Sequence, residues 1–301
     1  MSTLNHGLTL PKGYLSISQI EMFIRCPRSY YYRYIKGIKS PPSIALVTGS
    51  SGHAALEMNF RFKAKDAGKQ DAPVADVLDA FGTEFDERTK ELERPNPLTL
   101  SHTKDRTYDL ISLHQEQVAP GLVPEDENAI EQELKMEIGG IQMLGFADLI
   151  TPTAVVDHKF VGKTKSVNEA SNSLQLTFYA KATGKDTGAF NCLVKSKQSP
   201  KTGKWSAPKV QVVPSAPRTQ QDYTWLESVV QGVAHAISSG VFPPTDPTTW
   251  MCSEKFCGFW HMCRGAKGGP LDNPSAIITV PASVPRTLER TEPKRVHTLD
   301  V

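Results

Sequence analysis

The stretch GFADLITPTAVVDHKF, residues 145–160, predicts a β-hairpin, because two β-branched, apolar runs flank the turn residues TPT. A turn centred between Pro152 and Thr153 sets Asp148 directly opposite Asp157, since both residues lie equally far from that centre. Cross-strand partners of this kind have Cβ atoms about 5 Å apart on one face. Residues two apart on a strand share a face, so Lys159 is expected beside Asp157.

Two carboxylates at that separation repel each other unless a cation lies between them or one of them binds a proton. Hard divalent cations prefer carboxylate oxygens, and such a cation activates water when it lies beside a phosphate. An Asp-x-Lys pair alone is common on strands. The prediction of a metal-dependent hydrolytic site therefore depends on the segments around the hairpin.

Two further segments bring polar side chains toward the hairpin. Downstream, residues 168–184 predict one helix, on which Gln175 and Tyr179 lie one turn apart. Upstream, TGSSGH (residues 48–53) predicts a flexible glycine-rich segment followed by a helix that begins at His53. An imidazole in that position can project into a cleft.

The segments GFADLI (145–150), VVDHK (155–159) and LQLTFY (174–179) resemble the PD-(D/E)XK nuclease superfamily, specifically its RecB-like branch. The resemblance implies an α/β, restriction-endonuclease-like core with a mixed central sheet flanked by helices. It implies a Mg²⁺ or Mn²⁺ ion held by His53, Asp148, Asp157 and the backbone carbonyl of His158. The catalytic residues that it implies are Asp148, Asp157, Lys159, Gln175 and Tyr179.

Nearby polar residues leave alternatives open. Glu133 either supports the site or is solvated, and Glu57 either lies behind the metal ligands or at the surface. The His158 side chain is expected on the opposite face of the hairpin from its neighbours, so its imidazole is not expected to be a ligand.

Four of the five cysteines form a second pattern. Cys252, Cys257 and Cys263 follow one another in TWMCSEKFCGFWHMCRG (249–265), while Cys26 lies in FIRCPRSYYYRY (23–34). No secretory signal is visible at the N-terminus, and clustered cysteines then favour metal or cluster ligation over disulfides. Their C-x4-C-x5-C spacing suits tetrahedral zinc or an iron–sulfur cluster.

In the RecB-like branch, one N-terminal and three C-terminal cysteines hold an iron–sulfur cluster. The resemblance thus implies a [4Fe-4S] cluster on Cys26, Cys252, Cys257 and Cys263, with zinc as the alternative. The usual C-terminal spacing is C-x2-C-x5-C, from which this chain departs. Such a site would join the two ends of the domain. Cys192, within a predicted strand, is expected to be a small buried hydrophobe.

The resemblance covers about residues 16–265, which sets off an N-terminal extension (1–15) and a Pro-, Ser- and charge-rich tail (266–301) that is expected to be flexible. Within that domain, the predicted iron–sulfur site is divided between residue 26 and residues 252–263. Composition is ordinary, with 39% hydrophobic and 22% charged residues, and the net charge of +2 neither requires nor excludes nucleic acid. Candidate DNA contacts are Arg28, Arg33, Lys163, Lys165, Lys195 and Lys197.

The resulting hypothesis is a Mg²⁺- or Mn²⁺-dependent DNA exonuclease of viral or bacterial recombination, replication or repair, acting on single strands or duplex ends. The alternatives are a structure-specific endonuclease, a nuclease of CRISPR adaptation, and a non-catalytic DNA-binding scaffold with a four-cysteine metal site. A cytoplasmic location, no membrane association, and a recombinase, helicase or single-strand-binding partner are expected. The chain contains no GxxxxGK[ST] loop, so it cannot drive unwinding itself.

Overall fold

The computed structural model of the protein describes residues 10–66 and 70–263, and its centre is a five-stranded sheet in the order β1-β2-β3-β4-β5. Strands β3 and β4 run parallel, and the other neighbours are antiparallel. The strands are β1 (Ile130–Ile138), β2 (Ile141–Ile150), β3 (Ala154–Val161), β4 (Thr187–Val194) and β5 (Lys209–Pro214). The expected mixed sheet, with its three-stranded meander and two later strands, is confirmed.

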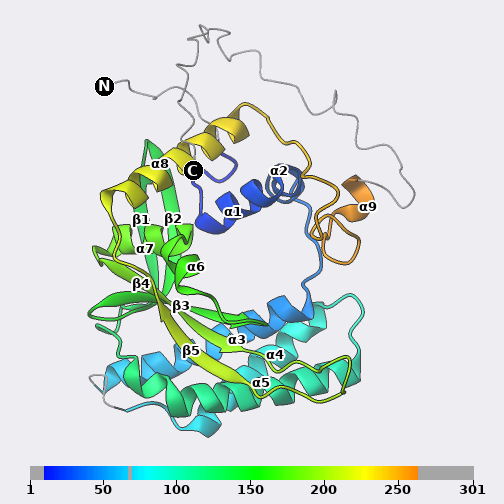
Figure 1. Ribbon diagram of the computed structural model, residues 1–301, viewed down its shortest axis with the longest axis vertical. Coiled ribbons are helices and arrows are strands. Elements are labelled where there is room, and N and C mark those ends of the chain that lie inside the picture. The colour runs from blue at the N-terminus through cyan, green and yellow to red at the C-terminus, as the bar shows by residue number, and fades with distance from the viewer. Residues whose placement is uncertain (1–9, 67–69, 264–301) are drawn as a thin grey trace, which may run out of the picture.

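Helices cover both faces of this sheet (Figure 1). One face carries α1 (Ile17–Arg25), α7 (Leu174–Thr183) and α8 (Gln220–Ser238), whose apolar side chains share the largest core cluster. The other face carries α3 (Ile44–Lys65) and α5 (Pro97–Gln117), and α4 (Val74–Arg88) packs on these two helices. The shorter helical segments are α2 (Pro27–Tyr30), η1 (Tyr31–Ile35), η2 (Thr89–Glu91), η3 (Ala119–Gly121), α6 (Val167–Ser171) and α9 (Trp260–Cys263).

Helix α3 differs from the sequence-based expectation. It begins at Ile44, where the Ser43 hydroxyl accepts a hydrogen bond from the Leu46 amide (3.2 Å), and it runs straight through the GSSG segment. The prediction of a helix start at His53 was therefore wrong. A Cβ at Gly52 would lie 2.2 Å from the Phe160 ring. The glycine is there because helix and strand approach closely, and not because the backbone bends.

The predicted helix over 168–184 is interrupted and forms α6 and α7. The Ser173 hydroxyl accepts a hydrogen bond from the Leu176 amide (3.2 Å), which starts a new helix shortly after α6 ends. Gly184 ends α7 in the left-handed conformation with φ 70°. Since Gln175 and Tyr179 both lie on α7, their relative placement one turn apart survives this correction.

The N-terminal segment lies against the sheet. Leu15 is fully buried, and it exchanges backbone hydrogen bonds of 2.9 Å with Gln142 and Leu144 of β2.

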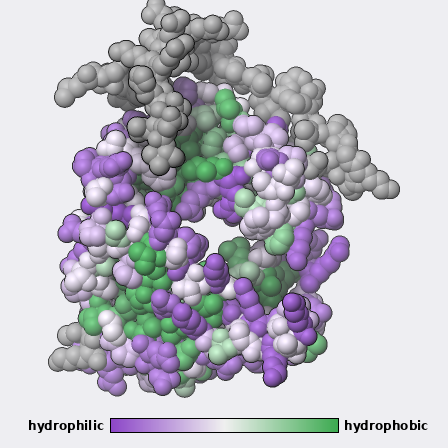
Figure 2. Space-filling view, viewed as in Figure 1, coloured by the Kyte–Doolittle hydropathy of each residue, from purple (hydrophilic) through white to green (hydrophobic). Residues whose placement is uncertain are grey.

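In the view of Figure 1, α1 and α2 lie above an opening and α3 lies below it, and Figure 2 shows that this opening is not filled by side chains. Among the described residues, no helix is both long and apolar enough to cross a membrane. The tail predicted over 266–301 lies outside the described residues.

Candidate active site

The candidate site lies where the pairing of β2 with β3 ends. The ladder consists of Ile150–Val155 and Leu149–Val156, which is the register expected for a turn centred between Pro152 and Thr153. The next residue, Asp148, accepts a hydrogen bond of 2.6 Å from the His158 amide through its Oδ2 atom. This bond replaces a ladder bond and holds the Asp148 carboxylate in place.

Asp148 meets a histidine from α3 and a glutamate from β1. His53 Nδ1 lies 3.4 Å from Asp148 Oδ1. One ligand atom from each of His53, Glu131 and Asp148 lies within 4.8 Å of the other two. Two carboxylates and an imidazole are a donor set that suits a divalent cation such as Mg²⁺ or Mn²⁺.

Glu131 is the site residue that the sequence analysis missed. The β1–β2 pairs Ile130–Leu149 and Gln132–Ala147 bracket a position at which Glu131 faces Asp148. A turn centred between Gly139 and Gly140 places Glu131 opposite Asp148, so the reasoning used for the Pro152–Thr153 turn would have identified Glu131 as a site residue. Glu131 has φ 49°, a left-handed backbone that is rare for a side chain of this size and that clusters at functional sites. Glu133 instead is exposed and pairs with Lys135, so it is solvated.

A second polar chain extends from Asp157 onto α7. Lys159 Nζ lies 2.7 Å from Asp157 Oδ2 and donates to Gln175 Oε1 at 2.8 Å. Gln175 in turn donates from Nε2 to the Tyr179 hydroxyl at 3.0 Å. The four residues therefore form one connected network, in which Lys159 has a fixed position between a carboxylate and an amide.

Burial and charge shift the pKa values of this group in different directions. Burial raises the pKa of Asp157 to about 6 against the opposing charge of Lys159. Burial also raises the pKa of Glu131 to about 7, and the neighbouring charge of Asp148 adds to this effect. For Asp148, burial is outweighed by the hydrogen bond and charge of His53, which hold its pKa below the ordinary value.

His53 shows the reciprocal effect. Burial would lower its pKa, but contact with Asp148 raises the pKa above the ordinary value. Without a cation, the contact with Asp148 thus favours the protonated form of His53, and Glu131 and Asp157 retain protons more readily than usual. A bound cation would compensate the same negative charge.

The His158 side chain lies on the opposite face of the sheet, as expected. Its ring stacks on Phe60 of α3 with a centroid distance of 5.4 Å. The Asn191 side-chain nitrogen lies 3.0 Å from His158 Nδ1 and 2.8 Å from His114 Nε2, and all three residues are buried. This polar triad connects β3, β4 and α5 directly behind the candidate site.

The four predicted cysteine ligands line one cavity of about 590 Å³ between α2 and the segment before α9. Burial raises the pKa of the Cys257 and Cys263 thiols, and the neighbouring thiols add to the effect. Within residues 10–66 and 70–263, no three of these sulfur atoms lie within 4.8 Å of one another. Cys192 is fully buried in β4, as expected.

The predicted DNA contacts differ in how far their side chains reach solvent. Arg28 is only 6% exposed, and its positive charge favours the Cys263 thiolate, so its placement with the thiols corrects the expectation of a DNA contact. Lys165 pairs with Glu169 at 2.9 Å. Lys195 is partly buried, which lowers the pKa of its ammonium group. Side chains that reach solvent are those of Arg33, Lys163 and Lys197.

Comparison with known proteins defines the class. A family model of the PD-(D/E)XK nuclease superfamily matches residues 14–264, and the chain belongs to this superfamily. The Gene 69 protein of Mycobacterium phage D29 is 24% identical over 278 residues, which cover 82% of this chain and 95% of that protein.

Among solved structures, the fold is similar to a protein from Eubacterium rectale named "Putative exonuclease". The TM-score is 0.51 at 12% identity, over 84% of this chain and 92% of that chain. An identity this low shows a shared fold alone. The restriction-endonuclease-like core is thereby confirmed, and the protein is a nuclease whose substrate class is DNA and whose His53–Glu131–Asp148 group can bind a metal ion.

Proposed function

We propose that the protein is a Mg²⁺- or Mn²⁺-dependent DNA exonuclease. The observation that carries the proposal is the convergence of two groups at the end of the β2–β3 ladder. The first group is His53, Glu131 and Asp148, and the second is the Asp157–Lys159–Gln175 network. A cation site beside a partly buried, hydrogen-bonded ammonium group suits phosphodiester hydrolysis better than a purely structural role, because burying the Asp148 and Asp157 carboxylates is otherwise costly.

In this proposal the metal ligands are His53, Asp148, Asp157, Glu131 and the backbone carbonyl of His158. When bound, the cation supplies a Lewis acid and lowers the pKa of a coordinated water molecule. Lys159 orients the attacking water and stabilises the negative charge that develops on the phosphate oxygens. Gln175 holds the Lys159 ammonium group at 2.8 Å, and Tyr179 holds Gln175 at 3.0 Å.

An exonuclease is favoured over an endonuclease by the opening between α1, α2 and α3 (Figure 2). Lys159 donates to Gln175 of α7, and α7 covers the same face of the sheet as α1. A site at the rim of such an opening suits a strand that enters by its end. The name of the Eubacterium rectale protein agrees with this preference.

The test compares wild type with Asp157→Ala and Lys159→Ala on labelled linear single strands, linear duplexes and circular single strands, with Mg²⁺, Mn²⁺ or EDTA. Linear substrates should be degraded with metal and remain intact with EDTA, and circles should resist. Both variants should lose activity, whereas Glu133→Ala, on an exposed side chain of β1, should retain it. Cutting of circles would instead support the endonuclease, and inactive wild type would support the scaffold.

We also propose a [4Fe-4S] cluster on Cys26, Cys252, Cys257 and Cys263. Tetrahedral zinc, with Zn–S bonds of about 2.3 Å, needs its sulfur ligands only about 3.8 Å apart. The four thiols line one cavity of about 590 Å³, and no three of their sulfur atoms lie within 4.8 Å of one another, which suits a larger group. Freshly purified protein should be brown, absorb near 400 nm and contain iron. Cys252→Ser should abolish this absorption and Cys192→Ala should not, while colourless protein containing zinc would refute the cluster.

The biological setting is proposed from the relative in a mycobacterial virus. We place the enzyme in viral or bacterial DNA recombination, replication or repair, in the cytoplasm of the bacterial or infected cell. A partner that supplies single strands, such as a helicase, recombinase or single-strand-binding protein, would complete its role. Affinity purification from infected cells before and after DNase treatment would separate direct partners from proteins that share its DNA.

A further inference from the structure

Two cavities along the solvent-facing side of α3 form one groove beside the candidate metal site. The first, about 500 Å³, includes His53 and Glu131 and extends toward Leu46. The second, about 330 Å³, extends toward Lys65. Both include Ala54 and Glu57, so they lie next to each other, and we call the two together the α3 groove.

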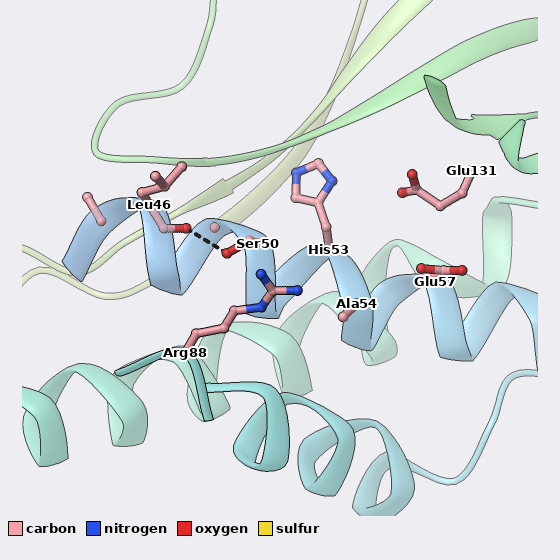
Figure 3. A pocket seen from close by; sticks show the side chains of 9 residues that line it. Leu46, Ser50, His53, Ala54, Glu57, Arg88 and Glu131 are labelled. Carbon is pink, nitrogen blue, oxygen red and sulfur yellow. Dashed lines mark hydrogen bonds between the residues drawn. The ribbon is translucent and has the colours of Figure 1, made fainter. Parts of the chain in front are cut away.

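Small side chains keep the first part of the groove open. Ala45, Gly49, Ser50 and Ala54 line it, and a Cβ placed on Gly49 would have no atom within 4 Å. The close-up in Figure 3 shows His53 and Glu131 at one side of this space, with Arg88 of α4 extending toward α3. The groove therefore has room for an extended chain next to the metal ligands.

The groove has acidic side chains where its two cavities meet, and each cavity also contains at least one basic side chain. Glu57 and Glu131 line the first cavity next to His53 and would repel a phosphate backbone in the absence of a cation. Among the described residues, Arg88 is the one arginine or lysine that lines the first cavity, and Arg61 and Lys65 line the second. This order of charges is complementary to a strand whose cleaved phosphate lies at the metal site and whose neighbouring phosphates lie on either side.

Both guanidinium groups are oriented by an acidic neighbour and remain partly exposed. Arg88 Nε lies 2.9 Å from Glu84 Oε2, and its side chain is 43% exposed. Arg61 Nε lies 2.7 Å from Glu57 Oε1, and its side chain is 48% exposed. Arginine carries five N–H donors in a planar fork, so the contact of Arg88 through Nε leaves its terminal donors for a phosphate. Arg61 also donates from one terminal nitrogen to the Ile130 carbonyl at 3.4 Å, and its remaining terminal N–H groups are left for a phosphate.

We propose that the α3 groove binds the DNA strand on both sides of the phosphodiester that is cleaved, with Arg88 contacting a phosphate on one side and Arg61 on the other. This inference rests on the proposed nuclease function. It assigns a positioning role to two residues that lie outside the metal site and the lysine network. Their contacts would fix which phosphate faces the metal ligands.

The experiment measures binding of a fluorescent single-stranded oligonucleotide over a range of salt concentrations, in an Asp157→Asn background that prevents cleavage. Each phosphate contact to a single strand contributes about 0.7 to the slope of log affinity against log salt. Arg88→Gln and Arg61→Gln should each weaken binding about tenfold and reduce the slope by about 0.7. Lys90→Gln is the matched control, because Lys90 lies two residues from Arg88, pairs with Glu87 and lines neither cavity.

Double variants separate a lost phosphate contact from a newly unpaired carboxylate. Arg88→Gln/Glu84→Gln and Arg61→Gln/Glu57→Gln remove both members of each pair. If the arginines contact phosphates, the doubles should keep the reduced slope. Recovery of wild-type binding in the doubles, or Arg88→Gln and Arg61→Gln behaving like Lys90→Gln, would overturn the proposal.

The outcome for the otherwise unaltered enzyme separates the two levels of inference. If the enzyme degrades DNA but the salt slope is the same with and without the two arginines, DNA binding in the α3 groove is refuted. The nuclease assignment then still holds. Enzyme that neither binds nor degrades DNA refutes both. Melting temperatures of the arginine, glutamate and Lys90 variants should stay near that of the protein in which each change is made, since these side chains are solvent-accessible.

Discussion

At the scale of single residues, Glu131 differs from Glu133 on the same strand because it lies in the candidate metal site. It faces Asp148 and His53, while Glu133 points into solvent. Glu131→Gln keeps the size of the side chain and removes its charge. The variant should need at least about tenfold more Mg²⁺ or Mn²⁺ for half-maximal cleavage, and Glu133→Gln should need no more than wild type. Metal titrations of cleavage rate test this, and equal requirements would exclude Glu131 as a ligand.

The raised pKa of Asp157 predicts an unusual dependence of stability on pH. The folded state releases this proton near pH 6, whereas the ordinary value is 3.8. Between these values the folded state binds more protons than the unfolded state, so stability rises as pH falls through 6. Above pH 6 the buried carboxylate is charged and its full destabilising effect is present.

Urea unfolding in EDTA at about pH 5 and about pH 7.5 tests this prediction. Wild type should gain more stability on acidification than Asp157→Asn, which has no carboxyl group to protonate at this position. Mn²⁺ should stabilise wild type more at the higher pH than at the lower one, because the ion binds the deprotonated ligands. Identical pH profiles for the two proteins would argue against the raised pKa.

At the scale of elements, the position of α3 on β3 decides where His53 lies. Gly52 allows this contact, since a Cβ there would lie 2.2 Å from the Phe160 ring. Gly52→Ala should lower the free energy of unfolding by about 1–3 kcal/mol, the usual cost of overpacking. Gly49→Ala, three residues earlier in the same helix, meets open space and should raise stability by about 0.5–1 kcal/mol. Denaturant titrations compare the two, and effects of the same sign would contradict the proposed close approach.

The triad of His114, Asn191 and His158 also holds separate elements together. It connects α5, β4 and β3 through hydrogen bonds of 2.8 and 3.0 Å within the buried core. Because His158 lies between Asp157 and Lys159 in sequence, a fixed His158 ring also fixes the direction in which its two neighbours point. The hydrogen bond from the His158 amide to Asp148 extends this rigidity to β2.

At the scale of the whole molecule, the cysteine cavity connects the beginning of the described chain with its end. Cys26 follows α1, and Cys252, Cys257 and Cys263 follow α8, while the whole sheet lies between them in sequence. The Tyr32 hydroxyl also donates to the Met262 carbonyl at 3.5 Å, and Tyr32 packs on Phe259. The two segments therefore depend on each other for their position.

If one cluster joins these segments, Cys26→Ser and Cys263→Ser break the same connection. Each should lower the melting temperature by a similar amount, and the double variant should be little worse than either single one, since the second change has nothing left to disrupt. Thermal melting of the four proteins tests this non-additivity. Fully additive losses would indicate that the two thiols act independently.

The sequence by itself determined the parts of the site that depend on local geometry. The hairpin register follows from the turn centre, the shared face of Asp157 and Lys159 follows from strand alternation, and Gln175 and Tyr179 follow from helix periodicity. These relations hold within one element or one tight turn. Residue type and spacing are therefore enough to predict them.

Only the tertiary structure decided which residues from distant elements meet. Glu131 joins the site because β1 pairs with β2 and its backbone takes a left-handed φ, and GSSG is helical because α3 packs on Phe160. Arg28 is buried with the thiols, and Arg88 and Arg61 share a groove with the metal ligands. Packing between elements sets these contacts, and local propensity carries no information about which distant surfaces will touch.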